Sequence, residues 1–467
     1  MKRFVLALLA LSLPGLAVAD PVSAGGTEVQ GPKKNLFISH GDRDRSIVVV
    51  HVDGARSFYA AQANTNVARG KALQIAKAAA VSGDTIIVGP GDYKITSSLA
   101  KNGVNWQFMA GASVTRTDET EGAVWDDRNT PMSFSVIGYG DFTRITTSDL
   151  ARSLVVRVRH PSSVISIQGR DFTALGPVAG RIDASVLRLE DGRVVLEGRN
   201  LNARANRNGY TLWWFNGSGV VRAARVTGDY VSVGGSVDKP PTGDFHVTAE
   251  ELETAIFSST TQPTAAMWIR CNILRDVLSD GGAVSITGSG KIYIDTLKAF
   301  GFIYLTEWKG LLYLNAEKHT ATINGADDLF NFLNVDGGEV YYRVRHIDPN
   351  GFGGASFGVT GGTLQWDAGT LKGSATTKGL SISGGTARLN GVTLDTATNG
   401  ATSPVMKSGG TLILNGGTAL VAEGRAPSIS AASPQDVKVY GNAVTNCAPT
   451  SNVTIQVGTL TVDPGVE

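Results

Sequence analysis

The chain has 467 residues, including 57 glycines, and its 42 Lys and Arg residues nearly balance its 41 Asp and Glu residues. This balance lacks the excess of positive charge typical of nucleic-acid-binding proteins, so we expect no nucleic-acid partner. Cys271 and Cys447 lie too far apart for zinc or redox motifs, and we expect each to be a buried free thiol. Abundant glycine and sparse charge favour an all-β chain with many tight turns.

Residues 1–19 have the pattern of a secretory signal peptide. Lys2 and Arg3 precede a leucine-rich run, and Ala17-Val18-Ala19 is a small-residue cleavage site. The alternative is a retained anchor, but the run is short for a membrane span. We expect cleavage after Ala19 and a secreted, periplasmic or cell-surface product. No membrane span is expected in the mature chain, because no later segment is long and apolar enough to form one.

Residues 20–64 form a polar N-terminal extension with one strand-like run, Ser46–Val52. Residues 65–81 then show apolar residues near helical spacing, with Asn64 or Thr65 able to cap the first turn. We predict a short α-helix there. Because the open end of a stacked-strand structure needs covering, we assign this helix a capping role.

From residue 82 to residue 462 the chain consists of short strand-like runs broken by glycine turns, followed by a tail at 463–467. A signature recurs as DGGEVYYRV, TGGTLQWDA, SGGTARLNG and SGGTLILNG, and DGGAVSITG at residue 280 has the same form. The second glycines of the four signatures are 24, 23 and 25 residues apart: Gly338, Gly362, Gly385 and Gly410. A period of this length, built from short strands, predicts a parallel β-helix in which each coil stacks on the previous one.

Aligned on these glycines, the repeat fixes which side chains point inward. The second and fourth residues after each glycine are apolar and should face the core: Val340, Tyr342, Leu364, Trp366, Ala387, Leu389, Leu412 and Leu414. The third and fifth residues should face outward. Tyr341 and Arg343 of the stretch YYRVRHI are therefore exposed, and Arg343 should form a cross-rung ion pair with Asp367, worth ~0.2–1 kcal/mol. A near copy, VVRVRH at Val155–His160, has no such register.

The segment 65–117, which joins the helix to SGDTIIVGPGDYKI and NGVNWQFMAGASV, resembles the opening coils of right-handed parallel β-helix proteins of the pectate-lyase-like superfamily. Bacteriophage tailspikes and secreted polysaccharide-processing enzymes share this opening. The resemblance implies a right-handed parallel β-helix, a polysaccharide or cell-surface glycan as partner and, if the chain is tailspike-like, a homotrimer. It leaves the activity open, because this fold hosts lyases, hydrolases, adhesins and scaffolds.

Residues 232–266 break the rhythm of the repeat. Pro240, Pro241 and Pro263 cannot join a central ladder. The segment Thr248–Ile256 is compatible with a short helix that has Thr248 as its cap and Glu251 in a capping box. We interpret the region as an excursion from the coils or a subdomain boundary.

Glycoside hydrolysis requires two carboxylates at ~5–10 Å. We name Asp327, Asp328, Asp336 and Asp367 as catalytic candidates, of which only Asp327-Asp328 matches an Asp-Asp motif of polygalacturonase-like members. The Gly-His-Gly motif of those enzymes is absent, and VWDDR at 124–128 lacks the histidine of pectate lyases. The alternative is that these carboxylates are solvated turn residues.

No cofactor or metal site is predicted. Calcium has one thin candidate, formed by Asp126 and Asp127 with Asn129, because calcium requires several oxygen ligands in one loop.

Between Arg144 and Arg225 there are 13 arginines, six acidic residues and no lysine. The guanidinium group suits carboxylate and sulfate groups, and aromatic rings are surfaces on which sugars stack, so this region favours an acidic polysaccharide. Our candidates for substrate binding are Arg204, Arg207, Trp213, Tyr341, Arg343 and Arg345. The alternative is that the arginines keep a β-surface soluble and that a tryptophan belongs to the core.

Two functions remain open. The first is an exported protein that binds and, as a lyase or glycoside hydrolase, would cleave an extracellular polysaccharide. The second is a non-enzymatic surface or virion-associated scaffold or adhesin.

Overall fold

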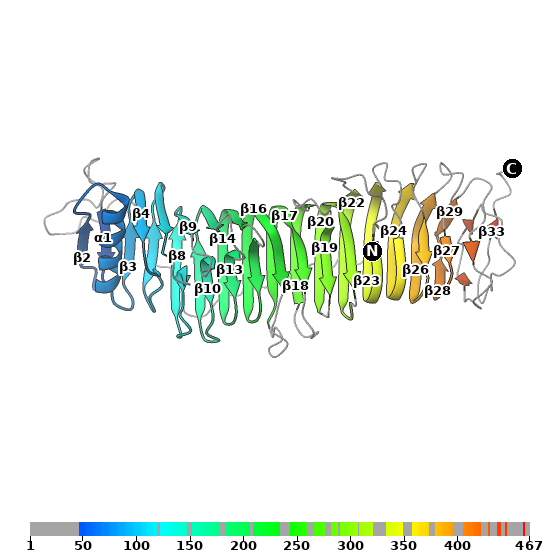
Figure 1. Ribbon diagram of the computed structural model, residues 1–467, viewed down its shortest axis with the longest axis horizontal. Helices are drawn as coiled ribbons and strands as arrows, with labels where there is room; N and C mark the ends of the chain where they lie inside the picture. The colour runs from blue at the N-terminus through cyan, green and yellow to red at the C-terminus, as the bar shows by residue number, and fades with distance from the viewer. Residues whose placement is uncertain are drawn as a thin grey trace.

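The computed structural model describes residues 46–118, 122–146, 152–176, 183–205, 209–233, 243–258, 266–275, 282–287, 290–306, 308–320, 333–348, 357–372, 379–395 and 405–421, together with 428–429, 437–439, 444–445 and 461–462. The predicted signal peptide, the tail at 463–467 and Cys447 lie outside these residues. Figure 1 shows an elongated solenoid with its strands stacked along the long axis.

The chain forms a parallel β-helix whose strands make three ladders along the axis. The first ladder comprises β3 (Thr85–Val88), β5 (Asn105–Phe108), β8 (Ser133–Gly138), β11 (Val164–Gln168), parts of β14 (Arg193–Arg204), β16 (Ser218–Val233), β17 (Phe245–Ser258), β18 (Ala266–Arg275), β20 (Lys291–Phe300), β22 (Leu311–Thr320), β23 (Leu333–Asp348), β24 (Phe357–Lys372) and β26 (Thr386–Asp395), then β28 (Thr411–Asn415) and β31 (Val437–Val439).

The second ladder follows the first within each coil. It comprises β4 (Gly91–Ile95), β6 (Ala112–Arg116), β9 (Asp141–Ile145), β12 (Asp171–Leu175), the later parts of β14 to β26, β29 (Ala419–Val421), β32 (Val444–Thr445) and β33 (Thr461–Val462).

The third ladder closes each coil. It comprises β7 (Gly122–Asp126), β10 (Ser153–Val158), β13 (Ala184–Leu189), β15 (Tyr210–Trp214), the ends of β16 and β17, β19 (Gly282–Thr287), β21 (Phe302–Thr306), the starts of β23 and β24, β25 (Leu380–Ile382), β27 (Val405–Lys407) and β30 (Ser428–Ile429).

The core lies inside the coils, where alternate residues of each strand point inward. Along the first ladder one inward column runs through paired residues that are all buried: Trp106, Val136, Ile167, Leu196, Val221, Val247, Ile269, Ile294, Leu314, Tyr342, Trp366, Leu389 and Leu414. The predicted inward register of the C-terminal repeat is thus confirmed. Cys271 is a buried free thiol, as expected, and burial raises its pKa to about 11.

The N-terminal end differs from the other coils. β1 (Ser46–Val50), within the strand-like run expected there, pairs antiparallel with β2 (Arg56–Ala60) and with β3. The helix α1 (Asn66–Ala79) begins where the Thr65 hydroxyl accepts a hydrogen bond from the Ala68 amide at 3.2 Å. α1 packs against β4 so closely that a Cβ on Gly70 would lie 1.7 Å from the carbonyl oxygen of Lys94.

The predicted helix at Thr248–Ile256 is wrong. These residues belong to β17, which pairs in register with β16 on one side and with β18 on the other. Two neighbouring coils supply hydrogen-bond partners along the segment, and this tertiary pairing outweighs a local capping pattern. Residues 243–258 therefore continue the coils, and residues 234–242 and 259–265 lie outside the description.

Two further details of the repeat differ from expectation. The described part of DGGAVSITG, Gly282–Thr287, forms β19 on the third ladder, whereas the glycine pairs of the four C-terminal signatures precede strands of the first ladder. The expected ion pair between Arg343 and Asp367 is absent from the described side chains. Asp367 instead accepts hydrogen bonds from the amide groups of Gln365, at 3.0 and 3.1 Å, and of Asn390. A neighbouring amide thus takes the place of the more distant guanidinium.

Candidate functional site

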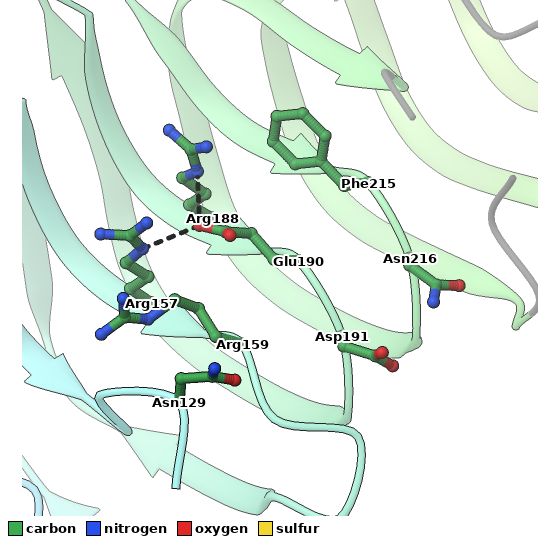
Figure 2. Close-up of a pocket in the computed structure, with 8 residues that line it drawn as sticks. All are labelled: Asn129, Arg157, Arg159, Arg188, Glu190, Asp191, Phe215 and Asn216. Atoms are coloured by element: carbon green, nitrogen blue, oxygen red, sulfur yellow. Dashed lines mark hydrogen bonds and ion pairs between the residues drawn. The ribbon is translucent and has the colours of Figure 1, made fainter. Parts of the chain in front are cut away.

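An open cavity of about 480 Å³ lies where the third ladder turns into the first. Its lining comes from four successive coils, at the ends of β7, β10, β13 and β15 and in the turns that follow them. The residues are Asn129, Arg157, Arg159, Arg188, Glu190, Asp191, Phe215 and Asn216 (Figure 2). We call this cavity the arginine cavity.

The turns that edge the cavity are set by local sequence. Asp191-Gly192 and Asn216-Gly217 are turn dipeptides, and both glycines adopt positive φ, of 81° and 77°. A Cβ on Gly217 would lie 2.3 Å from the Gly192 carbonyl oxygen, so the two turns stack this closely because residue 217 is glycine. The stacking brings the residues before each glycine to the same edge of the solenoid.

Glu190 holds two of the arginines together. Its Oε1 accepts a hydrogen bond from Arg157 Nε at 2.7 Å and lies 2.9 Å from Arg188 Nε (Figure 2). Arg157 and Arg188 are paired residues of neighbouring strands, and each side chain is only 11% exposed. Because both guanidinium groups contact Glu190, this carboxylate fixes the direction of both arginine side chains.

Two aspartates hold Arg159 in place by hydrogen bonds. Its Nη2 donates to Asp126 Oδ1 at 3.0 Å, and its backbone amide donates to Asp127 Oδ2 at 2.8 Å. Asp127 is fully buried and also accepts hydrogen bonds from the His160 amide, at 2.8 Å, and the Ser163 hydroxyl, at 2.9 Å. The residues that we considered for calcium are therefore engaged in holding a turn.

That turn carries unusual backbone geometry. Arg128 and Asn129 follow the two aspartates with φ of 51° and 60°. Asparagine tolerates this left-handed region, but arginine adopts it at a cost of about 1–2 kcal/mol. The Asp127 Oδ1 atom accepts a hydrogen bond from the Asn129 amide at 3.0 Å, which stabilises the turn and directs Asn129 to the cavity. Strained residues of this kind are concentrated at functional sites.

Aromatic rings back the arginines on one side. The Arg188 guanidinium carbon lies 4.6 Å from the ring centroid of Trp213 and 4.9 Å from that of Phe215. Trp213 also stacks with Tyr210, with ring centroids 4.4 Å apart. These contacts hold the Arg188 guanidinium against the faces of two rings and so fix its position at the edge of the cavity.

The charge excess of the sequence window 144–225 is balanced in space. Its arginines pair with carboxylates on adjacent coils, several of which lie outside the window: Asp118 with Arg144, Asp126 with Arg159, Asp141 with Arg170 and Glu253 with Arg225. A one-dimensional count misses these partners because they lie about one coil away in the sequence. The arginine cavity still gathers three arginines against two acidic residues.

Of the four catalytic candidates, only Asp336 and Asp367 lie among the described residues, and these two are far apart. Asp327 and Asp328 lie outside the described residues. Asp336 is exposed before the Gly337-Gly338 corner and accepts a hydrogen bond from the Thr360 hydroxyl at 2.8 Å. Asp367 lies at the far end of the first-ladder strand of the next coil. The four residue-to-residue steps of strand from Thr363 to Asp367 already span ~13 Å, beyond the separation that glycoside hydrolysis uses.

The five described binding candidates lie at four separate positions on the solenoid. Trp213 backs the arginine cavity, Tyr341 and Arg343 face outward on the first ladder, and Arg345 lies 3.2 Å from Glu317. Arg204 is exposed at the end of the second-ladder part of β14, and Arg207 lies outside the described residues.

Arg157 and Arg159 were noted in the sequence only as part of VVRVRH and not as binding candidates, and Arg188 and Glu190 were not singled out. The available signal was VVRVRH beside VLRLED, two strands with outward arginines at matching positions. Recognising that match requires the 31-residue coil that separates Arg157 from Arg188.

Comparison of the chain with family models, curated proteins and solved structures finds no match. Among the described residues no helix is both long and apolar enough to cross a membrane.

Proposed function

We propose that the protein is an exported polysaccharide-binding β-helix protein of the pectate-lyase-like type, and that the arginine cavity receives an acidic sugar. One observation carries the proposal: three arginines from two coils converge on one open cavity beside the rings of Trp213 and Phe215. Guanidinium groups recognise carboxylate and sulfate groups in a fixed geometry, and Phe215 adds an apolar side chain to the lining.

Binding is better supported than cleavage. Glu190 contacts two guanidinium groups and fixes their direction, which is a positioning role. A surface adhesin that recognises the same glycan without cutting it is the second candidate, and the scattered positions of Asp336 and Asp367 favour it over a hydrolase.

The test is affinity electrophoresis and calorimetry of the mature chain with uronate-containing and sulfated polysaccharides. The variant Arg159→Gln should weaken acidic-glycan binding at least ~10-fold, because a charge-assisted contact is worth ~1.5–3 kcal/mol. Arg170→Gln is the matched control: Arg170 belongs to the same sequence window and pairs with Asp141, but it does not line the cavity.

Equal binding by Arg159→Gln and Arg170→Gln, or no binding to any acidic glycan, would overturn the proposal. Release of reducing ends would identify a hydrolase, and new absorbance from unsaturated sugars would identify a lyase. Binding without either product supports the adhesin.

A further inference from the structure

The first ladder carries a second feature on its outer surface, well separated in sequence from the arginine cavity. Five successive coils place an aromatic ring at the same outward position, as residues that pair in register: His246, Trp268, Tyr293, Tyr313 and Tyr341. We call this row the aromatic column. Of its members, only Tyr341 was a candidate from the sequence.

The column is accessible to solvent. Trp268 is 41% exposed, an unusual fraction for the largest apolar side chain, and the three tyrosines are half-buried. The inward neighbours of these residues are core side chains such as Ile292 and Ile294, which fix the direction of each ring. A row of rings at one side-chain position is therefore built into the strand alternation.

The rings differ in how tightly they stack. Trp268 and Tyr293 lie 3.9 Å apart with an interplanar angle of 8°, so they cover each other's faces. Tyr293 and Tyr313 are 6.4 Å apart at 41°, and Tyr313 and Tyr341 are 6.5 Å apart at 34°. Neighbouring strands are separated by only ~4.8 Å, so these rings splay apart beyond the strand spacing. The splaying opens ring faces around Tyr313.

Mostly polar side chains flank the column on both sides. Two residues after the five rings, on the same outward face, stand Thr248, Arg270, Asp295, Asn315 and Arg343. Two residues before them stand Asp244, Lys291 and Glu339 and the apolar Ala266 and Leu311. Asn315 Nδ2 donates to Asp295 Oδ1 at 2.8 Å. The flanks thus hold donors and acceptors of both charges, with no strong excess of either sign.

This pattern fits a glycan better than a protein. A protein interface needs a broad apolar centre, whereas the column is one side chain wide and is bordered by charged groups. A polysaccharide chain presents C–H faces that pack on rings and hydroxyl groups that need donors and acceptors beside them. The rise of ~4.8 Å per coil is comparable to the length of a pyranose ring, so consecutive sugars can meet consecutive coils.

We infer that the aromatic column binds a neutral polysaccharide chain that runs along the solenoid axis, with its tightest contact at Tyr313. This site does not depend on the acidic-sugar site proposed above, because the two lie on different ladders and use different chemistry. A purely structural role would account for the closed Trp268–Tyr293 stack but not for the opening of the rings around Tyr313.

The test is affinity electrophoresis of the full mature chain in gels with soluble neutral polysaccharides (hydroxyethyl cellulose, glucomannan, galactomannan), followed by calorimetry with oligosaccharides of increasing length. Retardation is expected, with affinity rising with oligosaccharide length. Tyr313→Ala should weaken binding ~10-fold, and Tyr313→Phe, which keeps the ring, should retain most of it. Tyr139→Ala is the matched control, because Tyr139 is 67% exposed but lies outside the column.

Three results would overturn the inference. They are no retardation by any of these neutral glycans, equal affinity of Tyr313→Ala and Tyr139→Ala, and affinity independent of oligosaccharide length. Circular dichroism and thermal melts confirm that each variant is folded. Arg159→Gln should leave neutral-glycan binding unchanged, and Tyr313→Ala should leave acidic-glycan binding unchanged, so either site can fail without the other.

Discussion

The N-terminal and C-terminal parts of the solenoid reach the same cross-section by different means. Near the N-terminus, paired core residues are 20 residues apart at Ile86 and Trp106 but 31 apart at Val136 and Ile167. From Tyr342 onward the steps to Trp366, Leu389 and Leu414 are 24, 23 and 25 residues. The ladders continue unchanged while the turns absorb the differences. The turns therefore determine the length of each coil, and the packing of the core determines the register of the strands.

The two parts also rely on different interactions. The N-terminal coils fill their interior with rings, and Trp125 contacts Trp106, Phe134 and Phe142. The C-terminal coils use glycine corners and an amide row in which Asn415 donates to Asn390 and Asn390 donates to Asp367. The C-terminal coils also bury rings, because Tyr342, Phe357 and Trp366 pack on one another, but they add the amide row to this apolar burial.

Of the substitutions that test this comparison, removal of a buried ring from the N-terminal interior should lower the free energy of unfolding most. Trp125→Ala should lower the free energy of unfolding by ~3–5 kcal/mol, because Trp125 is fully buried among other rings and its removal leaves a cavity. Urea denaturation measures the change. Trp268→Ala, at a 41% exposed position, should cost much less. Equal losses in the two variants would show that the interior rings are not the main source of stability.

A second effect, of intermediate size, depends on pH and arises next to the regular part, where His319 of β22 contacts Tyr342. His319 is fully buried: Nε2 donates to the Gly301 carbonyl oxygen at 2.8 Å, so Nδ1 accepts from the Tyr342 hydroxyl, also at 2.8 Å. Burial lowers the pKa of His319 from 6.5 to about 4. The unfolded chain therefore binds a proton that the folded chain rejects, and stability present above pH 6.5 is lost as the pH falls towards 4.

Because of His319, the free energy of unfolding should fall by about 3 kcal/mol between pH 7 and pH 4. The measurement is urea denaturation at several pH values for the parent chain and for His319→Gln, which removes the titrating group. The parent should lose more stability over this range than the variant does. Parallel pH profiles for the two proteins would contradict the prediction.

The smallest expected effect is a difference in the free energy of unfolding between alanine variants of two glycines in the C-terminal repeat. Gly385 and Gly391 both have φ of 62°, but a Cβ on Gly385 would meet the Gly362 carbonyl oxygen at 2.5 Å, whereas nothing lies within 4 Å of one on Gly391. Gly391→Ala should cost ~1–2 kcal/mol from backbone strain alone. Gly385→Ala should cost at least ~1 kcal/mol more, because a stacked corner must also move. Thermal melts of the two variants would reveal equal losses if corner stacking were unimportant.

The difference between the two parts also explains what the sequence could predict. The inward register of Leu364, Trp366 and their equivalents followed from a visible repeat, because uniform turns keep the period constant. Around Arg157 and Arg188 the coils are longer and unequal, so the alignment that creates the arginine cavity leaves no period to find. Tyr341 was identified as exposed, but its ring neighbours Tyr313 and Tyr293 lie in coils whose lengths depart from the repeat.

Almost all the ladder hydrogen bonds of the described strands run parallel to the long axis of the solenoid (Figure 1). A force applied along that axis loads these bonds in tension, so coils separate one after another from an end. A force across the axis acts along the strands, and many bonds must then break together in shear. The protein is therefore mechanically anisotropic: strong when pulled sideways, and weaker when drawn out from one end.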